Sequence, residues 1–197
     1  MKGNLKNESK TALINAGRRI IVEKGYNNTG IQEVLQVAGV PKGSFYHFFS
    51  SKEDFGIQII NCDAEEHDKV LEQYLSNETL SPLNRLKHYF EDKCQEFESL
   101  KCREGCLLGN LGQEMADQNE AFRTRLQQVF AQWHDRFADC LRQAQTAGEI
   151  SSQWDARQLA EYCHNSWEGA LLQMKITKSP APLKAFITLT FGTVLKG

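Results

Sequence analysis

Several classes of protein are excluded by what the sequence lacks. None of its apolar stretches approaches the roughly 20 residues that a membrane-spanning helix needs, and residues 1–10 lack the apolar core of a signal peptide. We therefore expect a cytoplasmic chain with no membrane partner. No nucleophile elbow, metal-ligand pair, phosphate-binding loop or paired-carboxylate site is recognisable. We therefore expect no catalytic residues, no cofactor and no enzyme activity.

The six cysteines include no C-x-x-C pair. In a cytosolic chain they are expected to be reduced thiols, mostly buried as small apolar groups. A zinc site built from Cys94, Cys102 and Cys106, with His88 as a fourth ligand, is the alternative interpretation. Its spacing matches no common zinc-binding pattern, so we expect no metal.

Proline is scarce, with four residues in 197, and alternating strand patterns between turn residues are absent. Apolar residues recur at helical spacing instead, which predicts an all-α fold. Thr29-Gly30-Ile31-Gln32 has the form of a capping box, and Ser51 with Asp54 predicts another helix start. A glycine-punctuated segment covers residues 105–112. We expect helices at about residues 8–24, 29–38, 41–47, 51–74, 82–100, 119–147, 155–178 and 183–195.

The two helices that meet at Ala38-Gly39-Val40 predict a helix-turn-helix, whose second helix enters the major groove of DNA. That short second helix combines apolar anchors with polar side chains, which suits groove contacts better than a core. Its polar residues are Lys42, Ser44, Tyr46 and His47. Residues 1–56 hold eight basic and five acidic residues, a net +3, whereas the remainder holds 15 and 20, a net −5. A basic head on an acidic body is typical of nucleic-acid-binding proteins.

Residues 8–60 resemble the amino-terminal signature of the tetracycline-repressor (TetR) family. The resemblance rests on Gly25-Tyr26, Thr29, Ala38-Gly39-Val40, Lys42-Gly43-Ser44-Phe45-Tyr46-His47-Phe48-Phe49 and Ser51-Lys52-Glu53. It implies an N-terminal three-helix DNA-binding domain over residues 1–56 and a C-terminal helical ligand-binding and dimerisation domain over residues 57–197. It also implies that Gly43 and Ser44 begin the DNA-facing side of the recognition helix. The phosphate or groove contacts that it implies come from Thr29, Lys42, Tyr46, His47 and Lys52.

The same resemblance implies a pocket for a small-molecule effector within helices five to eight, and a homodimer formed by the last two helices of each subunit. A two-fold dimer reads double-stranded, palindromic operator DNA. The final helix agrees, because apolar side chains cover a wide arc of residues 183–195. We expect charged substitutions of Phe186 and Phe191 to destabilise this dimer.

Cys106 is the candidate sensing residue. It follows Gly105 at a predicted helix start, where the helix dipole and the basic Lys101 and Arg103 favour the reactive thiolate. The run Gly105-Cys106-Leu107-Leu108-Gly109-Asn110-Leu111, followed by Glu114, resembles a narrower subgroup in which some members respond to electrophiles or oxidants. Trp167, Leu171 and Lys175 share one helical stripe. If that stripe faces the pocket, Lys175 pairs with an acidic effector or with the Cys106 thiolate.

The sequence thus predicts a DNA-binding repressor that releases its operator on sensing a small molecule. Whether sensing is a covalent change at Cys106 or reversible ligand binding, with Cys106 a buried structural thiol, stays open. A helical adaptor that never touches DNA is a further alternative, but it gives no reason for the polar cluster at residues 42–47. The aromatic candidates for the pocket lining, which fit a plain core equally well, are Phe130, Trp133, Trp154 and Tyr162.

Overall fold

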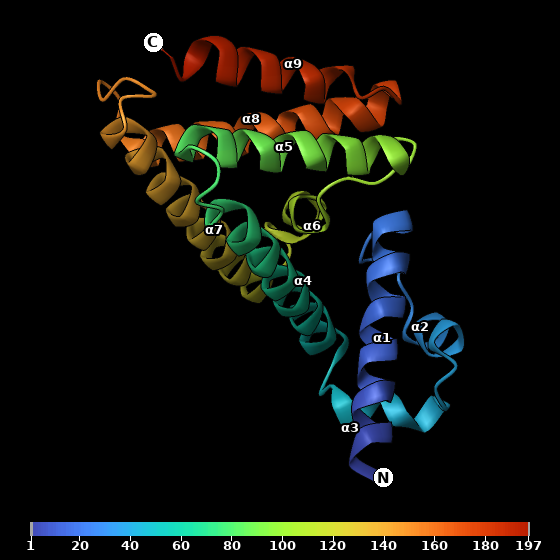
Figure 1. The fold of residues 1–197 in the computed structure, drawn as a ribbon. Helices are drawn as coiled ribbons and strands as arrows, with labels where there is room; N and C mark the ends of the chain where they lie inside the picture. The colour runs from blue at the N-terminus through green and yellow to red at the C-terminus, as the bar shows by residue number, and fades with distance from the viewer. Residues whose placement is uncertain (1, 197) are drawn as a thin grey trace. The chain divides into compact units, whose positions relative to one another are not determined.

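The computed structural model describes the backbone of residues 2–196 and the side chains of residues 8–196. Over this range the chain is built from helices alone (Figure 1), which confirms the predicted all-α fold. A 3-10 turn (Lys42–Ser44) precedes α3, and a π-helical turn (Thr190–Val194) follows α9. No described helix has the length and apolar character to cross a membrane. The helices are α1 (Lys2–Lys24), α2 (Ile31–Ala38), α3 (Phe45–Phe48), α4 (Lys52–Leu75), α5 (Pro82–Ser99), α6 (Leu107–Met115), α7 (Glu120–Thr146), α8 (Ala156–Thr177) and α9 (Ala181–Leu189).

The start of α4 is capped by Ser51, as the sequence predicts. The Ser51 hydroxyl accepts a hydrogen bond from the Asp54 N–H at 3.0 Å. The Asp54 carboxylate in turn accepts one from the Ser50 N–H at 2.8 Å, and this bond is the main reason that the pKa of Asp54 is lowered. The two bonds fix the point at which the chain leaves the short α3 and enters the long α4.

The capping box predicted at Thr29 is wrong. Gly30 is the N-cap residue of α2, and no side chain bonds to the open N–H groups there. The Thr29 hydroxyl donates instead to the Gly25 carbonyl at 2.7 Å. Gly25 ends α1 in the left-handed region at φ +84°, a conformation that favours glycine. Thr29 therefore stabilises the end of α1 rather than the start of α2.

Packing divides the chain into two compact units, of which the first comprises residues up to 65 together with residues 107–127. Its core contains the rings of Phe45, Phe49 and Phe55, whose centroids lie 4.8 to 5.2 Å apart. A Cβ added at Gly56 of α4 would lie 2.3 Å from the Phe122 ring of α7. Glycine thus lets α7 pack directly on the α4 backbone. Helix α6 and the start of α7 consequently belong with the N-terminal helices.

The second unit comprises residues 66–106 and residues from 128 onward. Phe90 of α5 is fully buried at its centre. Its ring lies 5.6 Å from Phe137 of α7, and 5.0 Å from both Trp167 of α8 and Phe186 of α9. One aromatic cluster therefore joins four helices. The predicted domain boundary between residues 56 and 57, which is a functional division, stays a prediction.

Candidate DNA-binding face and sensing site

The helix-turn-helix is formed by α2 and the short α3. Val34 of α2 is buried, and the helix ends at Gly39 with φ +65°. The Gly39 N–H bonds back to the Gln36 carbonyl at 3.2 Å, so the turn uses the left-handed conformation that glycine adopts most easily. Phe45 and Phe49 are both buried and anchor the second helix to the core of the first unit.

Away from these anchors, the short helix exposes a polar face. Tyr46 is 67% exposed, although the preceding Phe45 is fully buried. Lys42, Gly43 and His47 are also exposed, and Ser44 is half-buried. An exposed tyrosine beside a cation and an imidazole contributes little to packing. These groups do supply the hydrogen-bond donors that DNA phosphates and base edges accept.

Lys52 is tied to the turn between α1 and α2. Its ammonium lies 4.6 Å from the centroid of the Tyr26 ring and donates to the Asn27 carbonyl at 3.3 Å. Burial lowers the pKa of Lys52, and the nearby Glu114 carboxylate offsets part of that effect. Thr29 belongs to the same turn but is only 2% exposed. The Lys52 charge is therefore positioned beside the turn, whereas the Thr29 hydroxyl is occupied within it.

The Glu114 carboxylate of α6 holds the same turn. Its Oε2 accepts from the Tyr26 N–H at 2.8 Å, and its Oε1 accepts from the Asn27 N–H at 2.7 Å. A Cβ added at Gly25 would lie 2.9 Å from Oε2, so glycine provides room for the carboxylate as well as the required φ. The sequence marked Glu114 only as part of a motif. Its bonds to residues far earlier in the chain were missed.

Cys106 is half-buried and immediately precedes α6, as its place after Gly105 predicts. Its thiol forms a hydrogen bond with the Glu168 side chain of α8. Burial raises the pKa of Glu168, and the bond from Cys106 lowers it in part. The expected basic neighbours, Lys101 and Arg103, are exposed. A partner of the thiol in this structure is therefore an acid rather than a cation.

A cluster of buried and half-buried polar rings lies beyond Glu168, and no local sequence pattern indicates it. His164 is 5% exposed; its Nδ1 lies 2.8 Å from His134 Nε2, and its Nε2 lies 3.7 Å from Glu168 Oε1. His67 Nε2 lies 2.7 Å from the Tyr89 hydroxyl. Burial lowers the pKa of His67 to about 3 and that of His164 to about 4. Both imidazoles are therefore neutral near pH 7.

Two family descriptions match most of the chain. Residues 13–57 match "Bacterial regulatory proteins, tetR family", and residues 82–190 match "Tetracyclin repressor-like, C-terminal domain". The chain belongs to the TetR family. It is accordingly a DNA-binding transcriptional regulator and not an enzyme. Regulators of this family bind operator DNA, typically as dimers that respond to small-molecule effectors.

Individual relatives are similar to this chain along most of their length. The transcriptional regulator AcuR of Cereibacter sphaeroides is 41% identical over 92% of this chain and 82% of its own. The HTH-type transcriptional repressor DhaR of Mycobacterium sp. (strain GP1) is 33% identical over 93% of this chain and 90% of its own. The crystal structure of E. coli NemR in its reduced form is similar with a TM-score of 0.82 and 25% identity, and covers 91% of this chain and 94% of NemR.

The stripe predicted to face the effector has a packing role in this TetR-family regulator. The Trp167 ring contacts Phe90 and Phe186, Leu171 is 3% exposed, and Lys175 is half-buried. Among the aromatic candidates, Trp154 and Tyr162 are exposed. Phe130 and Trp133 instead pack against the His164 ring, with centroids 5.0 and 5.7 Å away.

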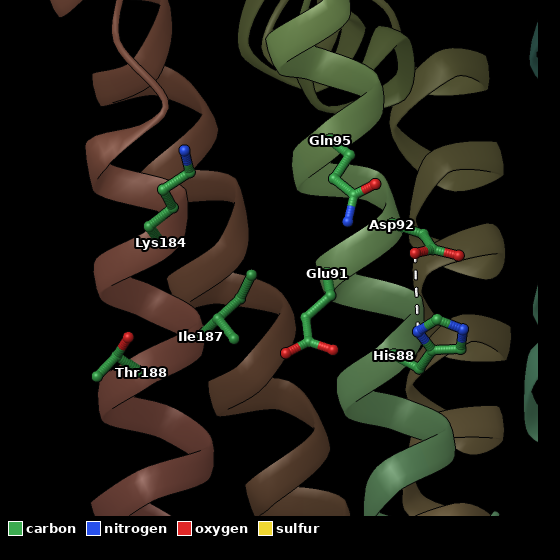
Figure 2. A pocket seen from close by; sticks show the side chains of 7 residues that line it. All are labelled: His88, Glu91, Asp92, Gln95, Lys184, Ile187 and Thr188. Atoms are coloured by element: carbon green, nitrogen blue, oxygen red, sulfur yellow. Dashed lines mark ion pairs between the residues drawn. The ribbon is translucent and has the colours of Figure 1, made fainter.

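A hollow of about 470 Å³ lies between α5 and α9 (Figure 2). It differs from a typical effector pocket. Effector pockets enclose their ligands within largely apolar walls. This hollow is open to solvent, and Ile187 is its one apolar lining residue. At its edge, His88 Nδ1 lies 3.7 Å from Asp92 Oδ1. The other lining residues are Glu91, Gln95, Lys184 and Thr188.

Proposed function

We propose that this TetR-family regulator is a homodimeric repressor that reads a palindromic operator with α3 and releases it when an effector acts at Cys106. The observation that carries the DNA-binding part is the contrast between the buried Phe45 and the exposed Lys42, Tyr46 and His47. A helix anchored on one side presents its polar side chains at fixed positions, as a recognition helix must. Apart from its own chain neighbours, no residue lies within 4 Å of a Cβ built at Gly43, so Gly43 leaves room for the DNA backbone beside Ser44.

Lys52 and Thr29 have different roles in this proposal. Lys52 begins α4, where open main-chain N–H groups also favour a phosphate. Its bond to Asn27 and its contact with Tyr26 hold the ammonium in place for that phosphate. The Thr29 hydroxyl donates to Gly25 and is buried. We assign Thr29 to the support of the turn rather than to a side-chain contact with DNA.

The dimer interface that we propose lies on the exposed sides of α8 and α9. Ile176 is 65% exposed and Leu189 is 60% exposed, and Leu172 and Val194 are also among the exposed apolar residues. Leu172 and Ile176 are four residues apart and so share one face of α8. Isolated exposed apolar residues are ordinary, but a row of them on adjoining helices is typical of an interface.

The sequence analysis expected charges at Phe186 and Phe191 to destabilise the dimer, but both side chains lie in the core of the protomer. They are 7% and 3% exposed within one protomer, because their rings pack against Phe90. Charges at these positions would therefore damage the protomer itself. The broad apolar arc of the last helix serves two purposes, since one part fills the core and another remains uncovered.

The sensing part of the proposal assigns the effector's action to Cys106. The thiol is half-buried, bonded to Glu168, and directly followed by α6. Helix α6 carries Glu114, whose carboxylate holds the turn between α1 and α2. A change at Cys106 thus acts on α6, the helix that supports the turn before the helix-turn-helix. The similar NemR structure is that of a reduced form, which supports a response based on thiol chemistry. Lys175 stays a candidate partner for an acidic effector, with Trp167 and Leu171 supporting its helix from the core.

Release of operator DNA tests this proposal. The Cys106→Ser variant is expected to bind the operator as the wild type does, and to stay bound after treatment with a quinone, an aldehyde or hypochlorite. Fluorescence anisotropy of labelled operator DNA measures both steps. A protein that keeps Cys106 but has its other five cysteines replaced by Ala is the matched control and should respond like the wild type. If Cys106→Ser releases DNA as readily as the wild type, the covalent proposal is wrong and reversible effector binding replaces it.

A further inference from the structure

A row of titratable groups, of which His164 is buried and the others are half-buried, leads from Cys106 towards α7. The Cys106 thiol bonds to the Glu168 side chain, Glu168 Oε1 lies 3.7 Å from His164 Nε2, and His164 Nδ1 lies 2.8 Å from His134 Nε2. All four residues belong to the second compact unit. Packing of an apolar core gives no reason to bury a carboxyl and an imidazole beside a thiol.

Two nitrogen atoms in this region lack the partners that buried polar atoms normally have. Among the described residues, His164 Nε2 and His67 Nδ1 are the buried side-chain atoms without a hydrogen-bond partner. The two rings are close neighbours, because Trp133 packs against both, with centroids 4.1 Å from His67 and 5.7 Å from His164. Unsatisfied polar atoms in a native core call for a specific explanation, such as a bound molecule. A small effector with oxygen atoms would satisfy them.

We propose that Glu168 is the base that takes the proton of the Cys106 thiol when the thiol adds to a small effector with a carbonyl-activated carbon–carbon double bond. The inference rests on the proposed sensing role of Cys106 and names the residue that makes this thiol reactive. His164 Nε2 and His67 Nδ1 offer hydrogen bonds to oxygen atoms of the effector. Glu168 touches the reacting atom, whereas the two histidines orient the molecule that reacts.

The chemical step is balanced without an oxidant. The Glu168 carboxylate accepts the proton of the thiol, and the sulfur electron pair forms a bond to the β-carbon of the effector. The electron pair of the double bond moves to the α-carbon and the carbonyl group. The proton on Glu168 then passes to the α-carbon, which restores the carboxylate. The product is a thioether, and no proton is gained or lost overall. Because burial raises the pKa of Glu168, the proton transfer from the thiol is less uphill than it would be to an ordinary carboxylate.

Two imidazoles near this base titrate in a more acidic range than a carboxyl whose pKa is raised. His67 of α4 and His164 of α8 have pKa values of about 3 and about 4, and burial also lowers the pKa of His134 on α7. Burial raises the pKa of Tyr89 on α5 well above its usual value. Further charged groups have fields that reach this cluster: Lys93 and Glu96 on α5, Asp135 on α7, and Arg157 and Glu161 on α8. A titration of Cys106 reactivity above pH 4 that is lost in the Glu168→Gln variant and kept in a His134→Gln variant is therefore assigned to Glu168.

The test is the rate at which N-ethylmaleimide labels Cys106 at a series of pH values, followed by peptide mass spectrometry. The Glu168→Gln variant keeps the shape of the side chain but cannot accept the proton, so we expect labelling at pH 7 to slow by at least about tenfold. Its rate should then rise with pH as the thiol itself ionises, without the step that the wild type shows at lower pH. Glu168→Asp, which restores a carboxylate, should recover part of the rate. Two controls should show no change. One is the labelling of Cys62, a half-buried cysteine in the same molecule, and the other is the Glu78→Gln variant at an exposed site in the second unit.

The outcomes separate this inference from the proposed function. Equal rates and equal pH profiles for the wild type and Glu168→Gln, with Cys106 labelled in both, overturn the role of Glu168 and leave Cys106 as the sensor. A wild-type protein in which Cys106 resists labelling while Cys62 reacts overturns both. If Glu168→Gln fails to fold by circular dichroism, Glu168→Asp decides. Its carboxylate is one methylene further from the thiol, so a labelling rate at pH 7 equal to that of the wild type contradicts the proposal.

Discussion

Glu114 accepts a hydrogen bond from the main-chain N–H of Tyr26 at 2.8 Å, although the two residues are 88 positions apart in the chain. The second oxygen of the same carboxylate accepts from the Asn27 N–H at 2.7 Å. Hydrogen bonds from N–H groups to an ionised carboxylate are stronger than those between neutral groups. Helix α6 is thereby fastened to the turn on which α2 and the Lys52 ammonium also depend.

Replacement of Glu114 by Ala should loosen this turn. Two N–H groups lose their acceptor, so we expect the free energy of unfolding of the first compact unit to fall by about 2 kcal/mol. We expect operator affinity to fall as well, because the turn positions Lys52. Urea denaturation and anisotropy on labelled DNA measure the two effects. Glu104→Ala, which removes an exposed carboxylate close to α6, is the control and should change neither. Unaltered stability in Glu114→Ala would show that the two hydrogen bonds to the Glu114 carboxylate contribute nothing to the free energy of unfolding.

Local patterns predicted the features that depend on neighbours in the chain. The turn at Gly39 and the cap at Ser51 follow from the preferences of single residues over four or five positions, and the structure confirms both. Thr29 fitted a local pattern too, yet its hydroxyl bonds to Gly25. The hydroxyl can accept from an N–H group at the start of α2 or donate to the Gly25 carbonyl, and a short pattern does not reveal which bond forms.

Contacts between residues far apart in the chain could not be predicted from the sequence. Glu168 meets Cys106 across 62 positions, and nothing in the local pattern of α8 distinguishes it from a solvated glutamate. Apolar periodicity, such as that of Trp167 and Leu171, can be recognised in a sequence. The environment of a single carboxyl, such as that of Glu168, cannot. The same limit applies to Phe186, since periodicity marks an apolar face without saying whether the core or a second subunit covers it.

The proposed dimer is expected to separate when charges are placed on its uncovered apolar face. Ile176→Glu and Leu189→Glu should give folded monomers, because both side chains are mostly exposed in the protomer and a charge buried at an interface without a partner is costly. Sedimentation velocity gives the mass, and circular dichroism gives the fold. Phe186→Glu is the contrasting variant and should unfold. Dimers that persist in both exposed-site variants would place the interface elsewhere.

Stability should depend on pH through the buried His164. Its pKa is about 4 in the folded protein and 6.5 at its ordinary value, so the unfolded chain binds more protons between these limits. The contribution is complete above pH 6.5 and is lost as the pH falls towards 4. We expect the free energy of unfolding to drop by about 2 kcal/mol between about pH 7.5 and 5 on account of this residue. His164→Gln should weaken the dependence, and His47→Gln, at an exposed site, should not. A dependence equal to that of the wild type in His164→Gln would contradict the burial of the neutral ring.

The salt dependence of binding tests whether the exposed face of the 3-10 turn (Lys42–Ser44) and α3 binds operator DNA. We predict that Lys42→Ala binds more weakly at every salt concentration and that the slope of log affinity against log salt becomes shallower by about one phosphate contact. Tyr46→Ala should lose affinity while its unfolding free energy is unchanged, because its ring is 67% exposed. Lys69→Ala, an exposed lysine of α4 in the second unit, serves as the control and should leave affinity and slope as in the wild type. An unchanged affinity and slope in Lys42→Ala, together with full affinity in Tyr46→Ala, would contradict the account.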